Sequence, residues 1–331
     1  MNLFSEKRVM IIGDIMLDTY LFGNVERISP EAPVPIVDVI IKQDKLGGAG
    51  NVAANIKELG GEPILCSVIG NDQKGEILCT LLKKHKISSS YLVKSDNRIT
   101  TNKTRIVGNN HQMLRVDDEI KTHLSTEDLK EFCSKLEKIL TNETIDIILF
   151  QDYDKGVISE CLINKMIKKS KELNIPIIVD PKKRNFDFYR NIKLLKPNFK
   201  EFKDGINLTI SDINNNETKY RKELLEKGSI ILHQRGIEIV LVTLAENGIF
   251  VSYKTPKGYN TQIIHGKPRD VSDVSGAGDT VMAVVAMLLD DMNIEKVAEI
   301  ANIAGGIVCE DVGVVPIDKE RLLNELDEQI T

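Results

Sequence analysis

A glycine-flanked aspartate near the end of the chain has the composition of an anion-binding catalytic turn. The segment Asp273-Val-Ser-Gly-Ala-Gly-Asp279 leads directly into an apolar run that predicts a buried helix. Free N–H groups of Gly276, Ala277 and Gly278 at the start of that helix would attract a phosphoryl group. Asp279, in the first turn, could accept a proton from a substrate hydroxyl. The same pattern also fits a helix-capping aspartate with glycines kept for packing.

A second glycine-rich turn lies much earlier in the chain. Leu46-Gly-Gly-Ala-Gly-Asn51 opens a predicted helix that begins at Val52. Gly47 and Gly48 leave room for a ligand, and the Asn51 amide offers a donor and an acceptor to a polyol. The turn does not directly follow the first strand, as a dinucleotide-binding fingerprint requires, and neither a P-loop nor the protein-kinase motif set occurs. The sequence therefore excludes these three nucleotide-binding classes.

An acidic residue also follows the first predicted strand. Asp14 comes directly after Gly13, where a parallel strand would reach its carboxyl end. Ligands of open α/β sheets bind at this edge, so Asp14 could hold sugar hydroxyls. A turn or helix-capping aspartate is the alternative interpretation. Asp18, further along, is interpreted as structural.

The elements that must position these residues alternate between strands and helices. The almost continuously apolar runs 9–12, 145–150, 175–179 and 239–243 are typical of strands buried on both faces of a parallel sheet. Helices are predicted from Ser125 to about Leu140, with Asp128 completing a capping box, and from Ser159 to about Leu173. Right-handed βαβ units and an α/β sandwich follow from this order.

A few early segments alternate polar and apolar residues instead. They include 34–41, 103–107 and 112–116, and Gly108-Asn109-Asn110 between the last two predicts a hairpin turn. We expect a small β-lid formed by two insertions, at about 15–45 and 90–118. A sheet with exposed edges and an apolar face favours a homodimer through the lid. A solvent-facing hairpin without a partner is the alternative.

Composition narrows the partners and the compartment. The chain has 331 residues, a net charge of −5 and no Trp, which disfavours nucleic acid as a partner. Its five cysteines form no CxxC pair, so a zinc site or disulfide frame is not expected, and a cytoplasmic location fits. The apolar run 281–289 is too short to span a membrane, and no signal peptide is recognised. We expect a single domain over residues 1–331.

The paired turns GGAGN and DVSGAGD resemble those of the ribokinase-like (PfkB) carbohydrate kinases, and the resemblance covers nearly the whole chain. It implies a three-layer α/β sandwich with a mainly parallel central sheet and a β-lid. It implies ATP-dependent, Mg²⁺-assisted phosphorylation of a sugar hydroxyl. Asp279 would be the catalytic base, and the backbone of Gly276, Ala277 and Gly278 would form the anion hole. Many members are activated by K⁺, although no K⁺ site is traced in this sequence.

The resemblance also implies a nucleotide site. Lys196-Pro-Asn-Phe-Lys-Glu201 is similar to the segment that organises magnesium and nucleotide phosphate, with Glu201 as the metal-associated residue. Thr243-Leu-Ala-Glu-Asn-Gly248 is similar to a T-x-G-x-x-G nucleotide loop but departs from it at Ala245. The candidate nucleotide-binding residues are Lys182, Asn198, Phe199, Lys200, Glu201, Thr243, Glu246 and Gly248.

Further segments resemble one branch of this family, the heptose 7-phosphate kinases. They are 9–20, 27–35, 112–117, Asp152-Tyr-Asp-Lys-Gly156 and Asp180-Pro-Lys182. The branch phosphorylates C1 of D-glycero-β-D-manno-heptose 7-phosphate on the route to ADP-heptose and lipopolysaccharide core. No HxGH motif occurs, so we expect a kinase without an adenylyltransferase domain.

A phosphorylated sugar requires a cationic contact, for which Arg105, Arg115 and Lys155 are candidates. Alternatively, the lid arginines are solvated or pair with nearby acidic residues at 117–119. Two other functions stay open at this point. One is a related kinase for ribose, fructose 1-phosphate or adenosine, and the other is a non-catalytic regulator that binds a sugar phosphate.

Overall fold

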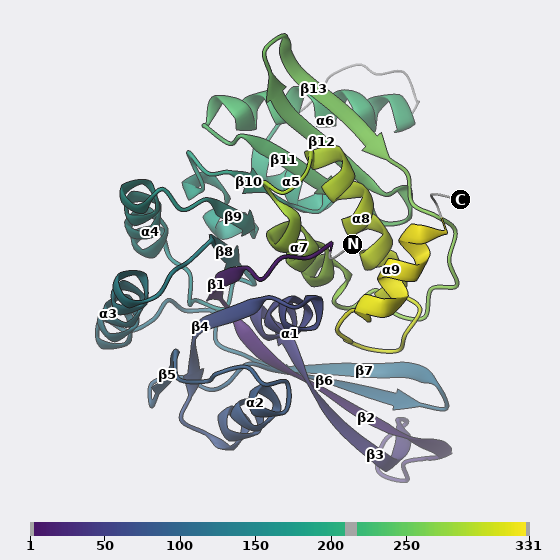
Figure 1. Ribbon diagram of the computed structural model, residues 1–331. Coiled ribbons are helices and arrows are strands. Elements are labelled where there is room, and N and C mark those ends of the chain that lie inside the picture. Colours follow the sequence, from purple (N-terminus) through teal and green to yellow (C-terminus); the bar gives the residue numbers. More distant parts are fainter. Residues whose placement is uncertain (1–2, 209–216, 329–331) are drawn as a thin grey trace.

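The computed structural model describes residues 3–208 and 217–328. Its larger sheet has nine strands in the order β13-β12-β11-β10-β9-β8-β1-β4-β5 (Figure 1). Neighbouring strands are parallel except at one edge, where β12 pairs antiparallel with both β11 and β13. The strands are β1 (Arg8–Gly13), β4 (Glu62–Gly70), β5 (Leu92–Ser95), β8 (Ile147–Gln151), β9 (Ile177–Asp180), β10 (Leu194–Leu195), β11 (Ile239–Thr243), β12 (Ile249–Thr255) and β13 (Gly258–Ile264).

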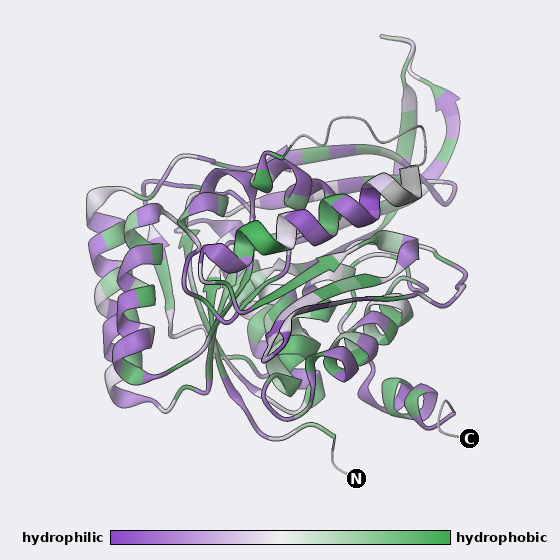
Figure 2. Cartoon of the chain, turned by 90° about the horizontal axis from the view of Figure 1, so that it is seen from above, coloured by the Kyte–Doolittle hydropathy of each residue, from purple (hydrophilic) through white to green (hydrophobic). Residues whose placement is uncertain are grey.

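Helices cover both faces of this sheet, which makes three layers. One face packs against α1 (Ala49–Leu59), α2 (Gln73–Lys84), α7 (Ala277–Leu288), α8 (Ile294–Val308) and α9 (Lys319–Asp327). The other packs against α3 (Thr126–Asn142), α4 (Glu160–Leu173), α5 (Phe199–Ile206) and α6 (Glu217–Gln234). Figure 2 shows apolar strands in the middle and polar residues on the outer sides of the helices. The predicted three-layer α/β sandwich with a mainly parallel central sheet is confirmed.

The predicted apolar strands and helices correspond to β1, β8, β9, β11, α3 and α4. Consecutive strand residues enter opposite layers, as Ile11 and Ile12 do, which explains the continuous apolar runs. One local prediction is wrong. The Ser125 side chain caps α3 by accepting from the Asp128 N–H, but the Asp128 carboxylate accepts instead from the Ser95 hydroxyl at 2.8 Å. Asp128 therefore links α3 to β5, and no capping box forms.

A four-stranded sheet of order β3-β2-β6-β7 lies at the lower end of the view in Figure 1. Its strands are β2 (Ile15–Ile28), β3 (Pro35–Gly48), β6 (Asn102–Gly108) and β7 (His111–Asp118). The turn between β6 and β7 has positive φ at Asn109 (50°) and Asn110 (66°), as a tight hairpin requires. The predicted insertion 90–118 starts too early, because residues 92–95 form β5 of the large sheet.

The two sheets are joined at the carboxyl end of β1, the edge of the large sheet where ligand binding was predicted. β1 ends at Gly13 and β2 starts at Ile15, so the chain passes from the large sheet into the small one at Asp14. It returns along β3 to Gly48, whose φ of 56° lies in the left-handed region, and enters α1. The Ala49 N–H donates to the Asp14 carbonyl at 3.0 Å, which ties the exit to the return. Among the described residues, no helix has both the length and the apolarity to cross a membrane.

Candidate active site

The two glycine-rich turns meet at Asp279, in the first turn of α7. The carboxylate is buried, with 2% of its surface exposed. Its Oδ2 accepts from Asn51 Nδ2 at 2.9 Å, although the two residues lie 228 positions apart. Gly276 has a φ of 88°, and a Cβ there would lie 2.8 Å from Asn51 Nδ2. A glycine at 276 therefore lets Asn51 reach the carboxylate.

Two further donors hold the other oxygen of Asp279. Gln151 Nε2, at the end of β8, donates to Oδ1 at 2.9 Å. The Tyr153 hydroxyl donates to the same atom at 2.7 Å. The carboxylate is thus fixed by three donors from two separate segments, which holds it in a single orientation.

The net pKa of Asp279 is raised to about 7, chiefly by burial and in part by the nearby Asp180 carboxylate. Hydrogen bonds from Asn51 and Tyr153, together with the Lys196 ammonium, lower the pKa and oppose that effect. A carboxylate whose pKa lies near neutral pH is a stronger base than an exposed aspartate. It is therefore well matched to proton removal from an alcohol.

The first prediction concerns pH. Only the ionised Asp279 can accept a proton, so kcat/KM should fall on the acid side with an apparent pKa of about 7. An exposed aspartate would place that limb near pH 4. The measurement is kcat/KM against pH with a coupled ADP-release assay. A rate that stays level down to pH 5 would contradict the assignment of Asp279 as the base.

Hydrogen-bond donors and a lysine lie at the start of α7. The first N–H groups of a helix have no partner within that helix and can bind an anion. The Ala277 N–H makes only a long bond of 3.4 Å, to the Val274 carbonyl in the preceding loop, which an anion could replace. Lys196 is buried at 2% exposure and pairs with Asp180 at 3.0 Å. A Cβ on Gly278 would lie 3.6 Å from Lys196 Nζ, so the ammonium is close to these N–H groups. The arrangement can stabilise negative charge on a transferring phosphoryl group.

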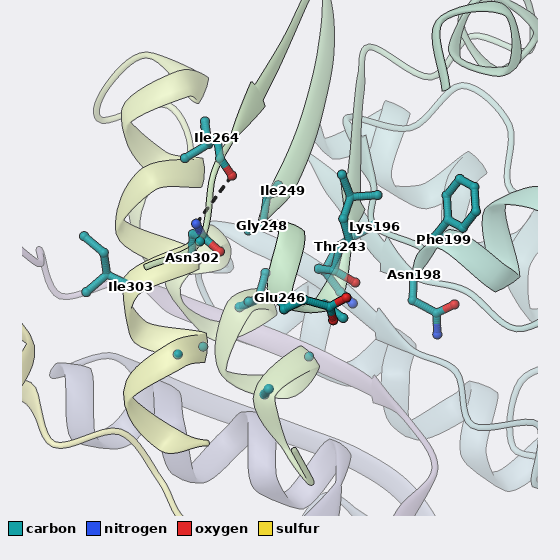
Figure 3. Close-up of a pocket in the computed structure, with 18 of the residues that line it drawn as sticks. Lys196, Asn198, Phe199, Thr243, Glu246, Gly248, Ile249, Ile264, Asn302 and Ile303 are labelled. Carbon is teal, nitrogen blue, oxygen red and sulfur yellow. Dashed lines mark hydrogen bonds between the residues drawn. The ribbon is translucent and has the colours of Figure 1, made fainter. Parts of the chain in front are cut away.

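A pocket of about 1660 Å³ opens beside α7. Figure 3 shows Thr243, Glu246 and Lys196 on one side of it and Asn302 and Ile303 of α8 on the other. Every residue predicted for nucleotide binding lines this pocket, namely Lys182, Asn198, Phe199, Lys200, Glu201, Thr243, Glu246 and Gly248. Gly276, Ala277 and Gly278 line it as well. The pocket thus joins the predicted nucleotide loops to the predicted anion hole.

The loop between β11 and β12 has an unusual backbone. Ala245 has a φ of 53°, in the left-handed region that favours glycine, where the resemblance expects a glycine. Gly248 has a φ of 91° and a ψ of −137°, and a Cβ there would lie 2.0 Å from the Ile264 carbonyl oxygen. Position 248 therefore requires glycine. Ala245 adopts a left-handed conformation that favours glycine, at a cost in the free energy of folding.

A second prediction follows from this pair. Replacing Gly248 by Ala should lower the free energy of unfolding by about 1–3 kcal/mol for the backbone conformation alone, with more from the clash. It should also raise the KM for ATP, because Gly248 lines the pocket. The matched change Ala245→Gly, in the same loop, should leave stability unchanged or raise it by up to about 1 kcal/mol. Chemical denaturation of both variants checks this, and equal losses in both would contradict it.

Asp14 is buried at 1% exposure and is held by the loop that follows β8. Its carboxylate accepts from the N–H groups of Tyr153 at 2.9 Å, Lys155 at 3.1 Å and Val157 at 3.1 Å. Burial raises the pKa of Asp14, while these three hydrogen bonds and Arg98 lower it. In this structure Asp14 organises the loop 153–157 beside the GGAGN turn. Its contact with sugar hydroxyls stays a prediction.

The three cations predicted to hold a substrate phosphate all have carboxylate partners. Arg105 on β6 is buried and pairs with Asp18 on β2. Arg115 on β7 is exposed and pairs with Asp117 at 2.9 Å on its own strand, and Lys155 pairs with Glu119 at 2.8 Å. A Cβ on Gly47 would lie 2.0 Å from Asp18 Oδ2, so Gly47 makes room for the Asp18–Arg105 pair.

A divalent metal at this pocket would require oxygen ligands, for which Glu201 is the candidate among the predicted residues. Glu201 Oε1 pairs with Lys182 Nζ, and Oε2 accepts from the Asn198 N–H at 2.9 Å in a capping box. In residues 3–208 and 217–328, no group of three or more His, Cys, Asp or Glu side chains could hold a metal. The site fits a hydrated ion held mainly by substrate phosphates, which is the usual binding mode of Mg²⁺.

Gln151, Tyr153, Asp180 and Lys196 were missed as site residues. Gln151 ends β8 and Asp180 ends β9, at the carboxyl edge where Asp14 follows β1. The rule applied to Asp14 could have found both. Tyr153 and Lys196 lie just beyond strand ends, and only the folded chain shows that they face α7.

A family model described as pfkB family carbohydrate kinase matches residues 6–320. The chain belongs to this family. It is therefore a carbohydrate kinase, a phosphotransferase that acts on an alcohol group. Kinases of this family use ATP and a divalent metal. The predictions of the enzyme class and of the family are confirmed.

Curated relatives named bifunctional protein HldE are similar to this kinase along nearly its whole length. The Granulibacter bethesdensis protein is 35% identical over 98% of this chain and 66% of its own length. The Methylobacillus flagellatus protein is 38% identical over 97% of this chain and 63% of its own length, and the Haemophilus influenzae protein is 35% identical over 98% and 64%. The chain thus spans about two thirds of the length of these relatives.

Solved structures share the fold at low identity. Phosphofructokinase-2 from Escherichia coli, in complex with potassium, has a TM-score of 0.80 and 18% identity, covering 99% of this chain and 100% of that one. Ribokinase from Arabidopsis thaliana, in complex with ribose and ATP, has a TM-score of 0.69 and 19% identity, covering 97% and 99%.

Proposed function

We propose that this kinase transfers phosphate from ATP to C1 of D-glycero-β-D-manno-heptose 7-phosphate. The 1,7-bisphosphate formed would supply ADP-heptose and lipopolysaccharide core synthesis. The support comes from the segments that resemble heptose 7-phosphate kinases and from 35–38% identity to the HldE proteins. The single observation that carries the chemistry is the Asn51–Asp279 hydrogen bond of 2.9 Å, which puts both glycine-rich turns at one carboxylate.

The proposed mechanism uses the chain's own groups. The sugar lies between the GGAGN turn and the small sheet, with its C1 hydroxyl at Asp279. Asp279 removes the hydroxyl proton as the oxygen attacks the γ-phosphorus and the bond from that phosphorus to the β,γ-bridging oxygen breaks, releasing ADP. The proton removal contributes roughly 10²–10⁴-fold. The N–H groups at the start of α7 and the Lys196 ammonium stabilise the phosphoryl oxygens. Closure of the small sheet excludes water and protects ATP from hydrolysis.

Mg²⁺ is the proposed divalent ion, and it would neutralise phosphate charge when bound. Glu201 would contact it through water, because Lys182 and the Asn198 N–H already engage its two oxygens. K⁺ is proposed as an activator. Arg105, Arg115 and Lys155 stay candidates for the 7-phosphate contact, and each would exchange its carboxylate partner for the phosphate.

We also propose a homodimer through the small sheet. Its two edge strands carry exposed apolar side chains, among them Ile40 on β3 at 67% and Leu114 on β7 at 56% exposure. Exposed apolar edges of this kind favour association. Sedimentation of the wild type and of an Ile40→Lys, Leu114→Lys variant tests this. A wild type that sediments as a monomer at micromolar concentration would contradict it.

The substrate test compares heptose 7-phosphate with ribose, fructose 1-phosphate and adenosine at equal concentrations. ADP release and phosphorus NMR of the product identify the acceptor and the carbon. We expect heptose 7-phosphate to have the highest kcat/KM and to yield a C1 phosphate. A higher value for another acceptor would overturn the substrate assignment, and sugar-phosphate binding without ADP release would favour a regulator.

A further inference from the structure

Tyr153 links the three parts of the active site that the sequence keeps apart. Its N–H donates to the Asp14 carboxylate at 2.9 Å. A Cβ on Gly48 of the GGAGN turn would lie 3.4 Å from the Tyr153 ring. Its hydroxyl donates to Asp279 Oδ1 at 2.7 Å. The ring also lies 5.2 Å from Lys182 Nζ, on the nucleotide side of the pocket.

The hydrogen bonds at Asp279 are divided unequally between its two oxygens. An ionised carboxylate offers about two acceptor positions on each oxygen. On Oδ1, Gln151 Nε2 and the Tyr153 hydroxyl take both positions. On Oδ2, Asn51 Nδ2 takes one, and within residues 3–208 and 217–328 no second side-chain donor occupies the other. A substrate hydroxyl can therefore approach Oδ2 without displacing a protein donor.

We propose that Tyr153 is a positioning residue that, with Gln151, closes Oδ1 of Asp279 and makes Oδ2 the atom that takes the acceptor proton. The proton moves from the substrate hydroxyl to Oδ2 as the bond from the hydroxyl oxygen to the γ-phosphorus forms, and the bond from that phosphorus to the bridging oxygen of ADP breaks. Tyr153 keeps its own proton throughout. This inference rests on the proposed role of Asp279 as the base, and the identity of the sugar does not enter it.

The surroundings of Asp279 support this division of roles. Gln151 is fully buried, and its Nε2 also donates to Asp180 Oδ2 at 3.1 Å, so its amide is held in place. The charged and titratable groups facing Asp279 are Asp180 at the end of β9, Lys182, Lys196 after β10 and Tyr153 itself. Burial and the neighbouring Asp279 and Asp180 carboxylates hold the pKa of Tyr153 well above its usual range, so the hydroxyl stays a donor at neutral pH.

The test replaces Tyr153 by Phe, which removes the hydroxyl and keeps the ring. Without this donor the ionised form of Asp279 is less stable, so the acid limb of kcat/KM should move up by about one pH unit. The kcat at the optimum should fall about 10-fold, because the carboxylate loses its fixed orientation. The acceptor used is the sugar on which the wild type turns over fastest.

Tyr189→Phe is the matched control. Tyr189 is also buried, and its hydroxyl donates to a buried carboxylate, Asp152 Oδ2, at 3.0 Å. Burial and the neighbouring Asp14 raise the pKa of Asp152 to about 7, so it is the rival source of an acid limb near neutral pH. We expect Tyr189→Phe to lower the thermal midpoint but to leave the limb in place. A limb that moves in Tyr189→Phe and not in Tyr153→Phe would overturn the proposal.

A second measurement does not require the Tyr153→Phe variant to fold. Incorporation of 3-fluorotyrosine into Tyr189→Phe makes the remaining phenols more acidic and therefore stronger donors. The acid limb should then move down, opposite to its movement in Tyr153→Phe. An unmoved limb in both experiments would overturn the role of Tyr153. Turnover retained by Asp279→Asn would instead overturn the proposed base itself, so the two failures are distinguishable.

Discussion

An Asp279→Asn variant should lose most of its turnover and keep its affinity for ATP. Asparagine has nearly the shape of aspartate but cannot accept the proton of an alcohol at neutral pH. General base catalysis contributes roughly 10²–10⁴-fold, so kcat should fall by that factor. The residues that line the candidate nucleotide pocket do not include Asp279, so the substitution leaves the lining of that pocket unchanged.

Two measurements separate lost chemistry from lost structure. Steady-state ADP release gives kcat, and isothermal titration with a non-hydrolysable ATP analogue gives the dissociation constant. The matched control is Asp128→Asn on α3, in the helical layer on the opposite face of the large sheet. This change affects a carboxylate that accepts from the Ser95 hydroxyl. The control should retain most of its activity. Normal turnover in Asp279→Asn would refute the assignment of the base.

The sequence predicted the structure well where the local backbone conformation allows only one type of residue. GGAGN and DVSGAGD require glycine because Gly48 and Gly276 adopt positive φ and lie against Asp14 and Asn51. The residues predicted for the nucleotide line a single pocket, since their loops all follow strands at one edge of the sheet. The fold class followed from apolar runs that a doubly covered parallel sheet requires.

The sequence did not predict which ion-pair or hydrogen-bond partner each charged side chain has in the structure. Arg105 and Arg115 alternate with apolar residues in similar ways, and for both the sequence left open a phosphate contact, solvation or pairing with the acidic residues at 117–119. In the structure they lie opposite each other in register, yet Arg105 is buried against Asp18 while Arg115 is exposed. Strand spacing fixes which face a residue occupies but not what covers that face. The capping box predicted at Asp128 does not form for the same reason. Its carboxylate accepts instead from the Ser95 hydroxyl at the end of β5, a contact that sequence spacing does not reveal.

Arg105→Gln should therefore destabilise the protein much more than Arg115→Gln. Removing Arg105 leaves the Asp18 carboxylate, whose side chain is 4% exposed, without its ion-pair partner. Breaking a buried pair from one side costs about 3–5 kcal/mol in the free energy of unfolding. Arg115 has a side chain that is 50% exposed, and loss of its pair should cost at most about 1 kcal/mol. Urea denaturation of both variants measures the difference.

The double change Arg105→Gln, Asp18→Asn provides the control, because it removes both charges and should recover part of the lost stability. Recovery would show that the cost arises from an unpaired buried carboxylate rather than from lost packing on Tyr20, whose ring centroid lies 5.2 Å from the guanidinium. If Arg105 also exchanges Asp18 for the substrate phosphate, Arg105→Gln would lose stability and in addition raise the KM for the sugar phosphate. A lost stability with an unchanged KM would leave Arg105 with a structural role and exclude it from the phosphate contact.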